Sequence, residues 1–163
     1  SIWCSCGEEC RQSDCPRLNA VWIEDTSLDG GMIETFVGHR SAGAIATFIG
    51  MTRDNFGGRP VAKLHYEAYR AMAVKQMREI CGEIRSKWDV CRIGMAHRLG
   101  DVPVSEASVR IAISSAHRAE SLQAVAFAID RLKATVAIFK REDYASGEAS
   151  QWKRNLELSL TDS

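Results

Sequence analysis

Residues 118–141 read RAESLQAVAFAIDRLKATVAIFKR and change from a helical pattern to a strand pattern within one stretch. In the first part, apolar residues recur at the helical period and predict an amphipathic helix over residues 118–133. The positions that should face inward are Leu122, Val125, Ile129 and Leu132. Residues 135–141 have the alternation and the β-branched content of a strand. This junction therefore places a helix directly before a strand.

Two lysines lie on either side of the junction, Lys133 at the end of the helix and Lys140 in the strand. In a strand, Lys140 shares one face with Val136 and Ile138, and a charged group in phase with aliphatic residues is unusual for a plain core. The pattern fits a face that lines a pocket for an anionic or electrophilic ligand. Lysine suits such work because partial burial disfavours its charged form. The spacing alone also fits two solvated lysines whose stems cover apolar surface.

The elements around this stretch alternate between strands and helices. Residues 71–88 form the clearest amphipathic helix, and a shorter helix is expected after Asp29-Gly-Gly. Strands are expected at residues 20–24, 42–51, 61–69, 90–99 and 108–115. Strand 42–51 is nearly all apolar and is expected to be buried, and the turn at 55–60 predicts a long hairpin with 61–69. Two long helices embedded among hairpins indicate an α+β fold with a mainly antiparallel sheet.

Length and composition favour one globular domain. With 163 residues, 45% of them hydrophobic and 26% charged, the chain is long enough to bury a core. Its formal net charge is zero, so the overall field gives no reason to expect nucleic acid or a membrane as a partner. No apolar run approaches the roughly 20 residues of a membrane span. The start of the chain lacks the apolar region of a signal peptide, and we expect a cytoplasmic protein.

The cysteines near the N-terminus fit no standard site. Four of the six in the chain fall within the first 15 residues: Cys4, Cys6, Cys10 and Cys15. A zinc cluster or a disulfide knot is conceivable, but two well-separated CxxC pairs are missing. The segment also lacks apolar periodicity. We therefore expect residues 1–18 to be a flexible, reduced tail, residues 19–153 to form the domain and residues 154–163 to form a second tail, with no metal site.

Basic side chains near strand and helix ends are candidates for anion binding. Arg53 follows an apolar strand, and a guanidinium there can grip a phosphate through two hydrogen bonds. His117 and Arg118 follow two serines at a helix start, where free backbone N–H groups favour an anion. His97 is in phase with apolar residues and is expected in the core, which leaves Arg98 as the better pocket candidate. Arg53 and Arg118 also fit plain solvated surface positions.

Five separated blocks carry a more specific signal together than any of them does alone. They are Gly43-Ala-Ile-Ala-Thr-Phe-Ile-Gly50 followed by Arg53-Asp-Asn, Tyr66-Glu-Ala-Tyr69, His97-Arg-Leu-Gly100, Ser114-Ser-Ala-His-Arg118, and Leu132-Lys through Phe139-Lys-Arg-Glu142. In this order and spacing, the chain resembles the catalytic (large) subunit family of molybdopterin synthase. The resemblance runs from about Asn19 to Trp152 and leaves out the cysteine-rich start.

The resemblance implies an α+β fold with a smaller hairpin-rich subdomain, and a homodimer at the centre of a heterotetramer. In that family, sulfur arrives on a small ubiquitin-like subunit that ends in a Gly-Gly thiocarboxylate. Two transfers to cyclic pyranopterin monophosphate then build the molybdopterin dithiolene. Carried over residue by residue, the resemblance implies Lys133 as the essential group and Lys140 as electrostatic support. The residues expected to bind the substrate are Arg53, Arg98, His117 and Arg118, and no cofactor is expected.

Two positions depart from the family's usual pattern, with Ala137 in place of Pro and Phe139 in place of Trp. Ala137 restores a backbone N–H and loosens the backbone. Phe139 keeps an aromatic ring but lacks the indole donor. We expect an altered pocket shape and intact chemistry. Two other functions stay open, a docking module that holds a Gly-Gly tail without catalysis and a phosphate-ligand-binding protein.

Overall fold

The computed structural model describes residues 1–7, 10, 12–28 and 30–155. Along the chain the elements are β1 (Ile2–Cys4), the 3-10 helix η1 (Gln12–Asp14), β2 (Leu18–Glu24), α1 (Gly30–Val37), β3 (Ala44–Met51), β4 (Asn55–Phe56), β5 (Arg59–Ala68), α2 (Arg70–Lys87), β6 (Ile93–Arg98), β7 (Gly100–Pro103), β8 (Ala107–Ser115), α3 (Arg118–Thr135), β9 (Ile138–Tyr144) and β10 (Lys153–Arg154). The helices and strands expected from the sequence all occur, with their ends shifted by a few residues.

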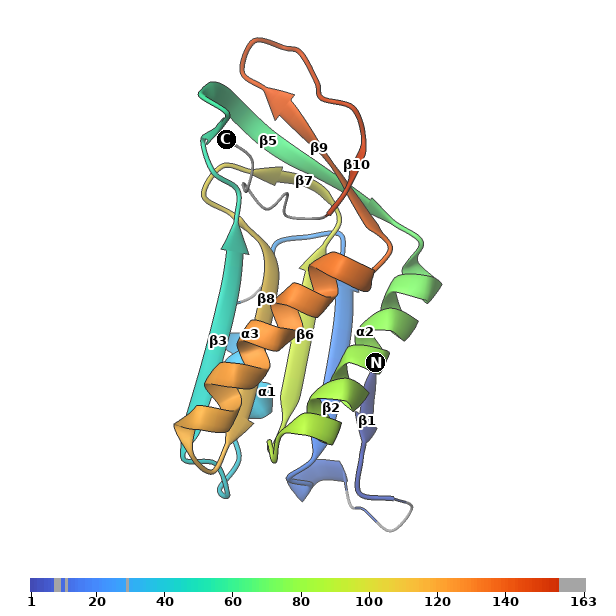
Figure 1. Cartoon of the computed structure of the whole chain (residues 1–163), viewed down its shortest axis with the longest axis vertical. Helices are drawn as coiled ribbons and strands as arrows, with labels where there is room; N and C mark the ends of the chain where they lie inside the picture. The colour runs from blue at the N-terminus through green and yellow to red at the C-terminus, as the bar shows by residue number, and fades with distance from the viewer. Residues whose placement is uncertain (8–9, 11, 29, 156–163) are drawn as a thin grey trace.

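The larger layer is a five-stranded sheet in the order β1-β2-β6-β8-β3. Strands β2 and β6 run parallel, and the other neighbouring pairs are antiparallel. In Figure 1, α2 and α3 lie side by side across one face of this sheet, and α1 lies behind it on the other face. The main core fills the space between the sheet and α2 and α3, with Met77, Ile84 and Ile113 among its fully buried side chains. The expected α+β fold is confirmed.

Helix α3 buries a slightly different face from the expected one. Ile129 and Leu132 pack inward as expected, but Leu122 is 58% exposed. Ser121 and Ala124 are buried in its place at the start of the helix. Small side chains at these positions allow the helix backbone to approach the neighbouring strands β3 and β8 closely.

A second sheet lies across one end of the first. Its order is β10-β9-β5-β4, with β7 also paired to β5, and all of its pairings are antiparallel. Figure 1 shows it at the upper end of the molecule, above the last turn of α3. Because α3 leads almost directly into β9, the end of the helix and the second sheet are held next to each other. This sheet is the smaller hairpin-rich part that the resemblance implied.

The expected long hairpin between residues 42–51 and 61–69 is wrong. Strand β3 pairs with β8 in the first sheet, whereas β5 pairs with β4, β7 and β9 in the second. The buried Thr52 fixes the point where the chain leaves the first sheet, because its hydroxyl donates to the Val102 carbonyl at 3.1 Å. Its N–H donates to the Glu106 carbonyl, also at 3.1 Å. The chain is therefore turned towards the second sheet before a hairpin can form.

Strand β3 is also less buried than its apolar composition suggests. It forms one edge of the first sheet, and alternate side chains along it face outward. Ile45, Ile49 and Met51 are 46%, 40% and 54% exposed. The continuous apolar run therefore reflects an exposed apolar edge as well as a core face.

The described part of residues 1–18 is not a free tail. Ile2–Cys4 pairs antiparallel with β2, and Trp3 packs against the main core. Cys15 is only 2% exposed. A three-residue strand is too short to show periodicity, so sequence pattern alone did not predict this strand.

At the other end of the chain, the fold extends past the expected boundary at residue 154. Arg154 is part of β10, and Asn155 is 6% exposed. Residues 156–163 of the expected second tail lie outside the described residues.

Candidate functional site

A pocket of about 780 Å³ lies where the two sheets meet the end of α3. Its lining comes from β3 and the turn after it, from β4, β5, β8 and β9, from the end of α3 and from the residue after β10. The lining residues are Phe48, Ile49, Gly50, Met51, Arg53, Asn55, Phe56, Val61, Leu64, Tyr66, Ser108, Val109, Lys133, Lys140, Glu142 and Asn155. A concave site of this size suits a small-molecule ligand.

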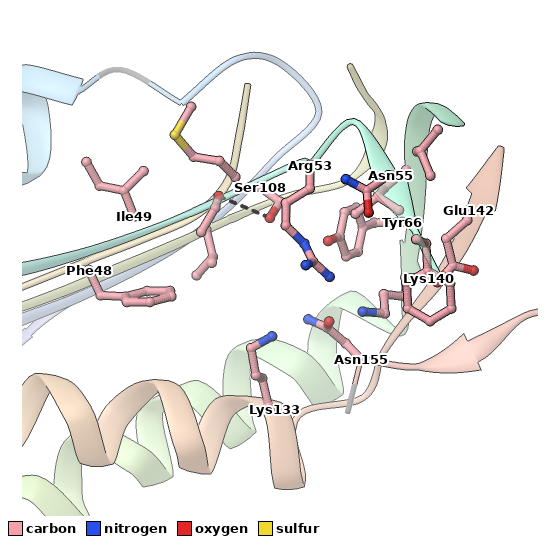
Figure 2. A pocket seen from close by; sticks show the side chains of 16 residues that line it. Phe48, Ile49, Arg53, Asn55, Tyr66, Ser108, Lys133, Lys140, Glu142 and Asn155 are labelled. Carbon is pink, nitrogen blue, oxygen red and sulfur yellow. Dashed lines mark hydrogen bonds between the residues drawn. The ribbon is translucent and has the colours of Figure 1, made fainter. Parts of the chain in front are cut away.

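Lys133 and Lys140 both point into this pocket, as Figure 2 shows. Lys133 lies in the last turn of α3. Lys140 lies in β9, paired in register with Tyr66 of β5 on one side and Lys153 of β10 on the other. The helix-to-strand junction thus brings two ammonium groups, seven residues apart in sequence, to one cavity. This placement favours the pocket interpretation over two unrelated solvated lysines.

Arg53 supplies a third positive charge from another wall of the pocket. It directly follows Thr52, whose hydrogen bonds fix the end of β3. In Figure 2 its guanidinium points towards the side of the pocket where Lys133 and Lys140 lie. Cations gathered over one cavity attract an anionic ligand, and a guanidinium can bind two oxygens of a phosphate at once.

Glu142 is the acidic group among the described lining residues, and it is already paired. Its side chain is 2% exposed and lies 3.2 Å from the Lys153 ammonium. It also accepts a hydrogen bond from the Ser150 hydroxyl. Burial opposes ionisation of Glu142, but these two partners outweigh burial and lower its pKa. The described lining thus holds three cationic side chains, Arg53, Lys133 and Lys140, and one carboxylate, which is paired with Lys153.

A fully buried His97 supports one wall of the pocket. Its Nδ1 lies 2.8 Å from the Arg98 carbonyl and donates to it, which leaves Nε2 to accept from the Asn155 amide at 3.4 Å. The ring also packs edge-on against Tyr66. Burial lowers the pKa of His97 to about 4, and the nearby charge of Lys133 acts in the same direction. The expected core histidine is confirmed, and it is neutral at physiological pH.

Sequence reasoning missed Asn155 and Glu142 as pocket residues. Asn155 lies in a segment without periodicity that was assigned to a tail. Glu142 ended a recognised block, but an alternating strand pattern does not show that a carboxylate is buried. The signal for Glu142 was present, because it is in phase with Lys140 and therefore on the same face of the strand.

In the junction between the two lysines, Ala137 makes a hydrogen bond that the family's usual proline could not make. The N–H of Ala137, which a proline would lack, donates to the Gln76 side-chain oxygen at 2.7 Å. Gln76 belongs to α2, so this bond ties the junction to the neighbouring helix. Phe139 packs edge-on against Tyr69, with ring centres 6.1 Å apart. The two departures from the family's usual residues are thus both accommodated by contacts.

The other predicted substrate-binding residues lie outside this pocket in the single chain. Arg98 pairs with Glu106 at 3.3 Å, and its side chain is 12% exposed. His117 and Arg118 are exposed at the start of α3. At a rise of 1.5 Å per residue, the helix places them about 22 Å from Lys133. One chain therefore brings together the two lysines and Arg53 but not these three residues.

Comparisons with known proteins agree with this fold. The family model described as MoaE protein matches residues 23–135 of the chain. The chain belongs to the MoaE family. It is 53% identical over 148 residues to molybdopterin synthase catalytic subunit 1 of Aedes aegypti, over 90% of this chain and 96% of that protein.

Solved structures resemble this MoaE chain along most of its length. Molybdopterin synthase from Staphylococcus aureus has a TM-score of 0.76 at 32% identity, over 80% of this chain and 94% of that one. A complex of subunits 1 and 2 of molybdopterin-converting factor from Helicobacter pylori shares the fold, with a TM-score of 0.66 at 20% identity, over 79% of this chain and 87% of that one. The predicted family and the role of catalytic subunit in molybdopterin synthesis are therefore confirmed.

Proposed function

We propose that this MoaE chain transfers sulfur from the Gly-Gly thiocarboxylate of a small ubiquitin-like subunit to cyclic pyranopterin monophosphate, forming the dithiolene of molybdopterin. The observation that carries the proposal is the convergence of Lys133, Lys140 and Arg53 on one cavity (Figure 2). A thiocarboxylate and a cyclic phosphate are both anions and repel each other. Positive charges around the place where they meet reduce that repulsion.

In this proposal each cation has a distinct role. Lys133 is the essential group, because it can stabilise negative charge that develops as the thiocarboxylate attacks and can also exchange protons there. Lys140 adds electrostatic stabilisation from the strand side. Arg53 holds the phosphate. The carboxylate of Glu142 in the lining is paired with Lys153.

The partner and the assembly are part of the same proposal. The Helicobacter pylori structure, described as a protein–protein complex of subunits 1 and 2, supports a small-subunit partner. A terminal Gly-Gly has no side chains to obstruct a narrow approach to the lysines. We further propose a central homodimer with one small subunit at each outer end. The exposed apolar side chains of Ile45, Ile49 and Met51 on edge strand β3 support a surface that another chain covers.

In that homodimer, His117 and Arg118 serve a pocket only if the second copy supplies them, because within one chain the helix separates them from Lys133 by about 22 Å. Arg98 stays a candidate for the same task. None of the helices in the described part of the chain has the length and apolar character to span a bilayer. A place in the cytoplasm stays a prediction.

The direct test supplies the chain with a thiocarboxylated small subunit and cyclic pyranopterin monophosphate and measures dithiolene formation. Lys133→Ala should remove nearly all turnover while partner binding persists. Lys133→Arg should also fail if proton transfer matters, because arginine does not deprotonate in proteins. Lys75→Ala, an exposed lysine of α2, is the matched control and should keep normal turnover. Near-normal turnover of Lys133→Ala would refute the proposed mechanism.

Mixing variants tests the contribution of the second copy. If Arg118 acts on the partner copy's pocket, a mixed dimer of Lys133→Ala and Arg118→Ala chains contains one intact pocket and one with both defects. Activity should then reappear on mixing two inactive homodimers. No recovery in a verified mixed dimer would show that Arg118 does not act across the interface.

A further inference from the structure

Four thiols outside the pocket gather at one point in the connection between β1 and β2. Each of Cys4, Cys6, Cys10 and Cys15 offers one sulfur, and all four sulfurs lie within 4.8 Å of one another. The Cys4 and Cys15 sulfurs are 3.0 Å apart, and those of Cys6 and Cys15 are 3.4 Å apart. All four are free cysteines. The family model begins at residue 23, so family membership does not explain this cluster.

We propose that these four cysteines bind one Zn²⁺ ion in a closed, structural tetrathiolate site. A tetrahedral zinc has Zn–S bonds of about 2.3 Å, which places its sulfurs about 3.8 Å apart. That value lies between the shortest observed separation, 3.0 Å, and the upper bound of 4.8 Å. Shifts of less than about 1 Å therefore convert the cluster into a zinc site.

The arrangement suits an ion better than disulfides. A disulfide joins sulfurs in pairs, whereas here Cys15 lies close to both Cys4 and Cys6, and Cys10 completes a group of four. A tetrahedral ion uses all four sulfurs at once. Four thiolates and tetrahedral geometry suit zinc or iron among biological metals, and zinc needs no redox partner.

Backbone N–H groups are already aimed at two of the sulfurs. The Cys6 N–H donates to the Cys4 sulfur at 3.1 Å, and the Arg17 N–H donates to the Cys15 sulfur at 3.3 Å. Such bonds stabilise thiolates and orient metal ligands. Arg85 lies close enough to the cluster to interact with it electrostatically. Burial lowers the pKa of Arg85, and its interaction with Cys6 and Cys15 acts in the opposite direction. Its positive charge partly offsets the net charge of −2 of a zinc tetrathiolate.

The folded domain holds the backbone that carries these ligands. The Arg92 guanidinium donates to the Cys15 carbonyl at 2.8 Å and to the Ser13 carbonyl at 3.4 Å. On the strand side, the Asn19 amide donates to the Ser5 hydroxyl at 2.7 Å. The backbone next to Cys4, Cys6 and Cys15 is therefore anchored, which reduces the entropy lost when an ion binds.

The position of the cluster indicates a structural role. In Figure 1 the end of β1 and the start of β2 lie at the lower end of the first sheet. The second sheet, which carries the pocket residues Lys140 and Glu142, lies at the upper end. All four ligands come from the protein, so no coordination position is left for a substrate. The ion would fix β1 on the edge of the first sheet, where Trp3 packs against the core and under Arg78. Binding replaces the protons of the thiols, which pass to solvent.

The test uses the full chain, purified under reducing conditions, stripped of metal and then titrated with Zn²⁺. Native mass spectrometry should show one zinc per chain. Co²⁺ in its place should give the visible absorption of a tetrahedral thiolate complex. In Cys10→Ser, the zinc affinity should fall by more than the roughly 10–100-fold that loss of an outer-shell partner costs. Cys91→Ser, which removes a cysteine outside the cluster, should bind zinc like the parent chain.

Thermal unfolding gives a second readout. A chelator should lower the Tm of the zinc-loaded chain and of Cys91→Ser, and should leave that of Cys10→Ser unchanged. The proposal would be overturned if the reduced chain bound no zinc, or if the parent and Cys10→Ser had equal zinc affinity. Iron in place of zinc in the chain as isolated would overturn it as well. A mass lowered by four hydrogens with no metal would show two disulfides and would also overturn it.

Discussion

The hydrogen bond between Ala137 and Gln76 makes a quantitative prediction about the junction that separates the two lysines. The bond is 2.7 Å long, and Ala137 is 7% exposed. Gln76→Ala leaves this N–H without its partner, which costs about 1–3 kcal/mol for a buried group. Gln76 is half-buried, so water replaces part of the lost bond, and we expect a loss of about 1–2 kcal/mol. Alanine is a good helix former, so helix propensity adds no further cost in α2.

Ala137→Pro should behave differently, because the backbone is already suited to proline. The Ile138 N–H donates to the Val136 carbonyl at 2.8 Å, so Ala137 is the middle residue of a three-residue turn. Among the described residues, the non-glycine residue with a positive φ is Ser105, so φ of Ala137 is negative. The turn is therefore of the inverse type, in which the central residue has a φ of about −75°. Proline fixes φ close to that value. Val136, at φ −79° and ψ 133°, is in the extended region that precedes proline without strain.

The two changes should therefore be coupled. Ala137→Pro loses the hydrogen bond but gains about 0.4–1 kcal/mol by restricting the unfolded chain, so its stability should stay within about 0.5 kcal/mol of the parent. In that background, Gln76→Ala should cost little, because the bond is already absent. Urea denaturation of the parent, both single variants and the double variant should give a coupling energy of about 1 kcal/mol. Additive effects would refute the reasoning, because they would show that the bond contributes nothing to stability.

Two further predictions concern the pocket and its support. Arg53→Ala should weaken binding of cyclic pyranopterin monophosphate by about 1.5–3 kcal/mol, the scale of a hydrogen bond to a charged group. Arg40→Ala, at the opposite end of the molecule from the pocket, should leave this affinity unchanged. If calorimetry gave the same affinity for Arg53→Ala as for the parent chain, Arg53 would be a plain surface residue. Because the pKa of His97 is lowered to about 4 from 6.5, the unfolded chain binds more protons between these values, and stability should fall as the pH drops below about 6.5. The contribution of His97 to the free energy of unfolding changes by up to about 1.4 kcal/mol per pH unit, and this dependence should be missing in His97→Gln. Urea titrations between about pH 6.5 and 5 measure it. The same pH dependence in the parent and in His97→Gln would contradict the neutral buried histidine.

Sequence reasoning recovered the parts of the fold that local pattern determines. The period of α2 and α3 identified both helices, and the change of period after Leu132 located the junction that carries Lys133 and Lys140. What failed depends on tertiary pairing. The apolar run of β3 does not say whether β8 or β5 is its partner, because either strand satisfies its backbone equally well.

The same limit applies to the candidate site. Of the pocket residues that were found, Lys133 and Arg53 lie next to recognisable element ends, and Lys140 lies in a strand with a recognisable pattern. Asn155 was missed because its place depends on a bond to His97, 58 residues away in sequence. The approach of the four cysteine sulfurs to one another was not predicted, for a related reason. These sulfurs come together only in the folded connection, and their spacing in the sequence matches no standard metal site.

The division of the pocket between two sheets has a consequence for the order in which activity and structure are lost. Lys133 belongs to a helix packed on the first sheet, whereas Lys140 and Glu142 belong to the second, which contains only short strands apart from β5 and β9. Sub-global opening of the second sheet therefore separates the two ammonium groups while the larger core remains closed. Amide hydrogens of β9 should exchange faster than those of β8. Heat inactivation should then begin below the temperature at which the whole chain unfolds.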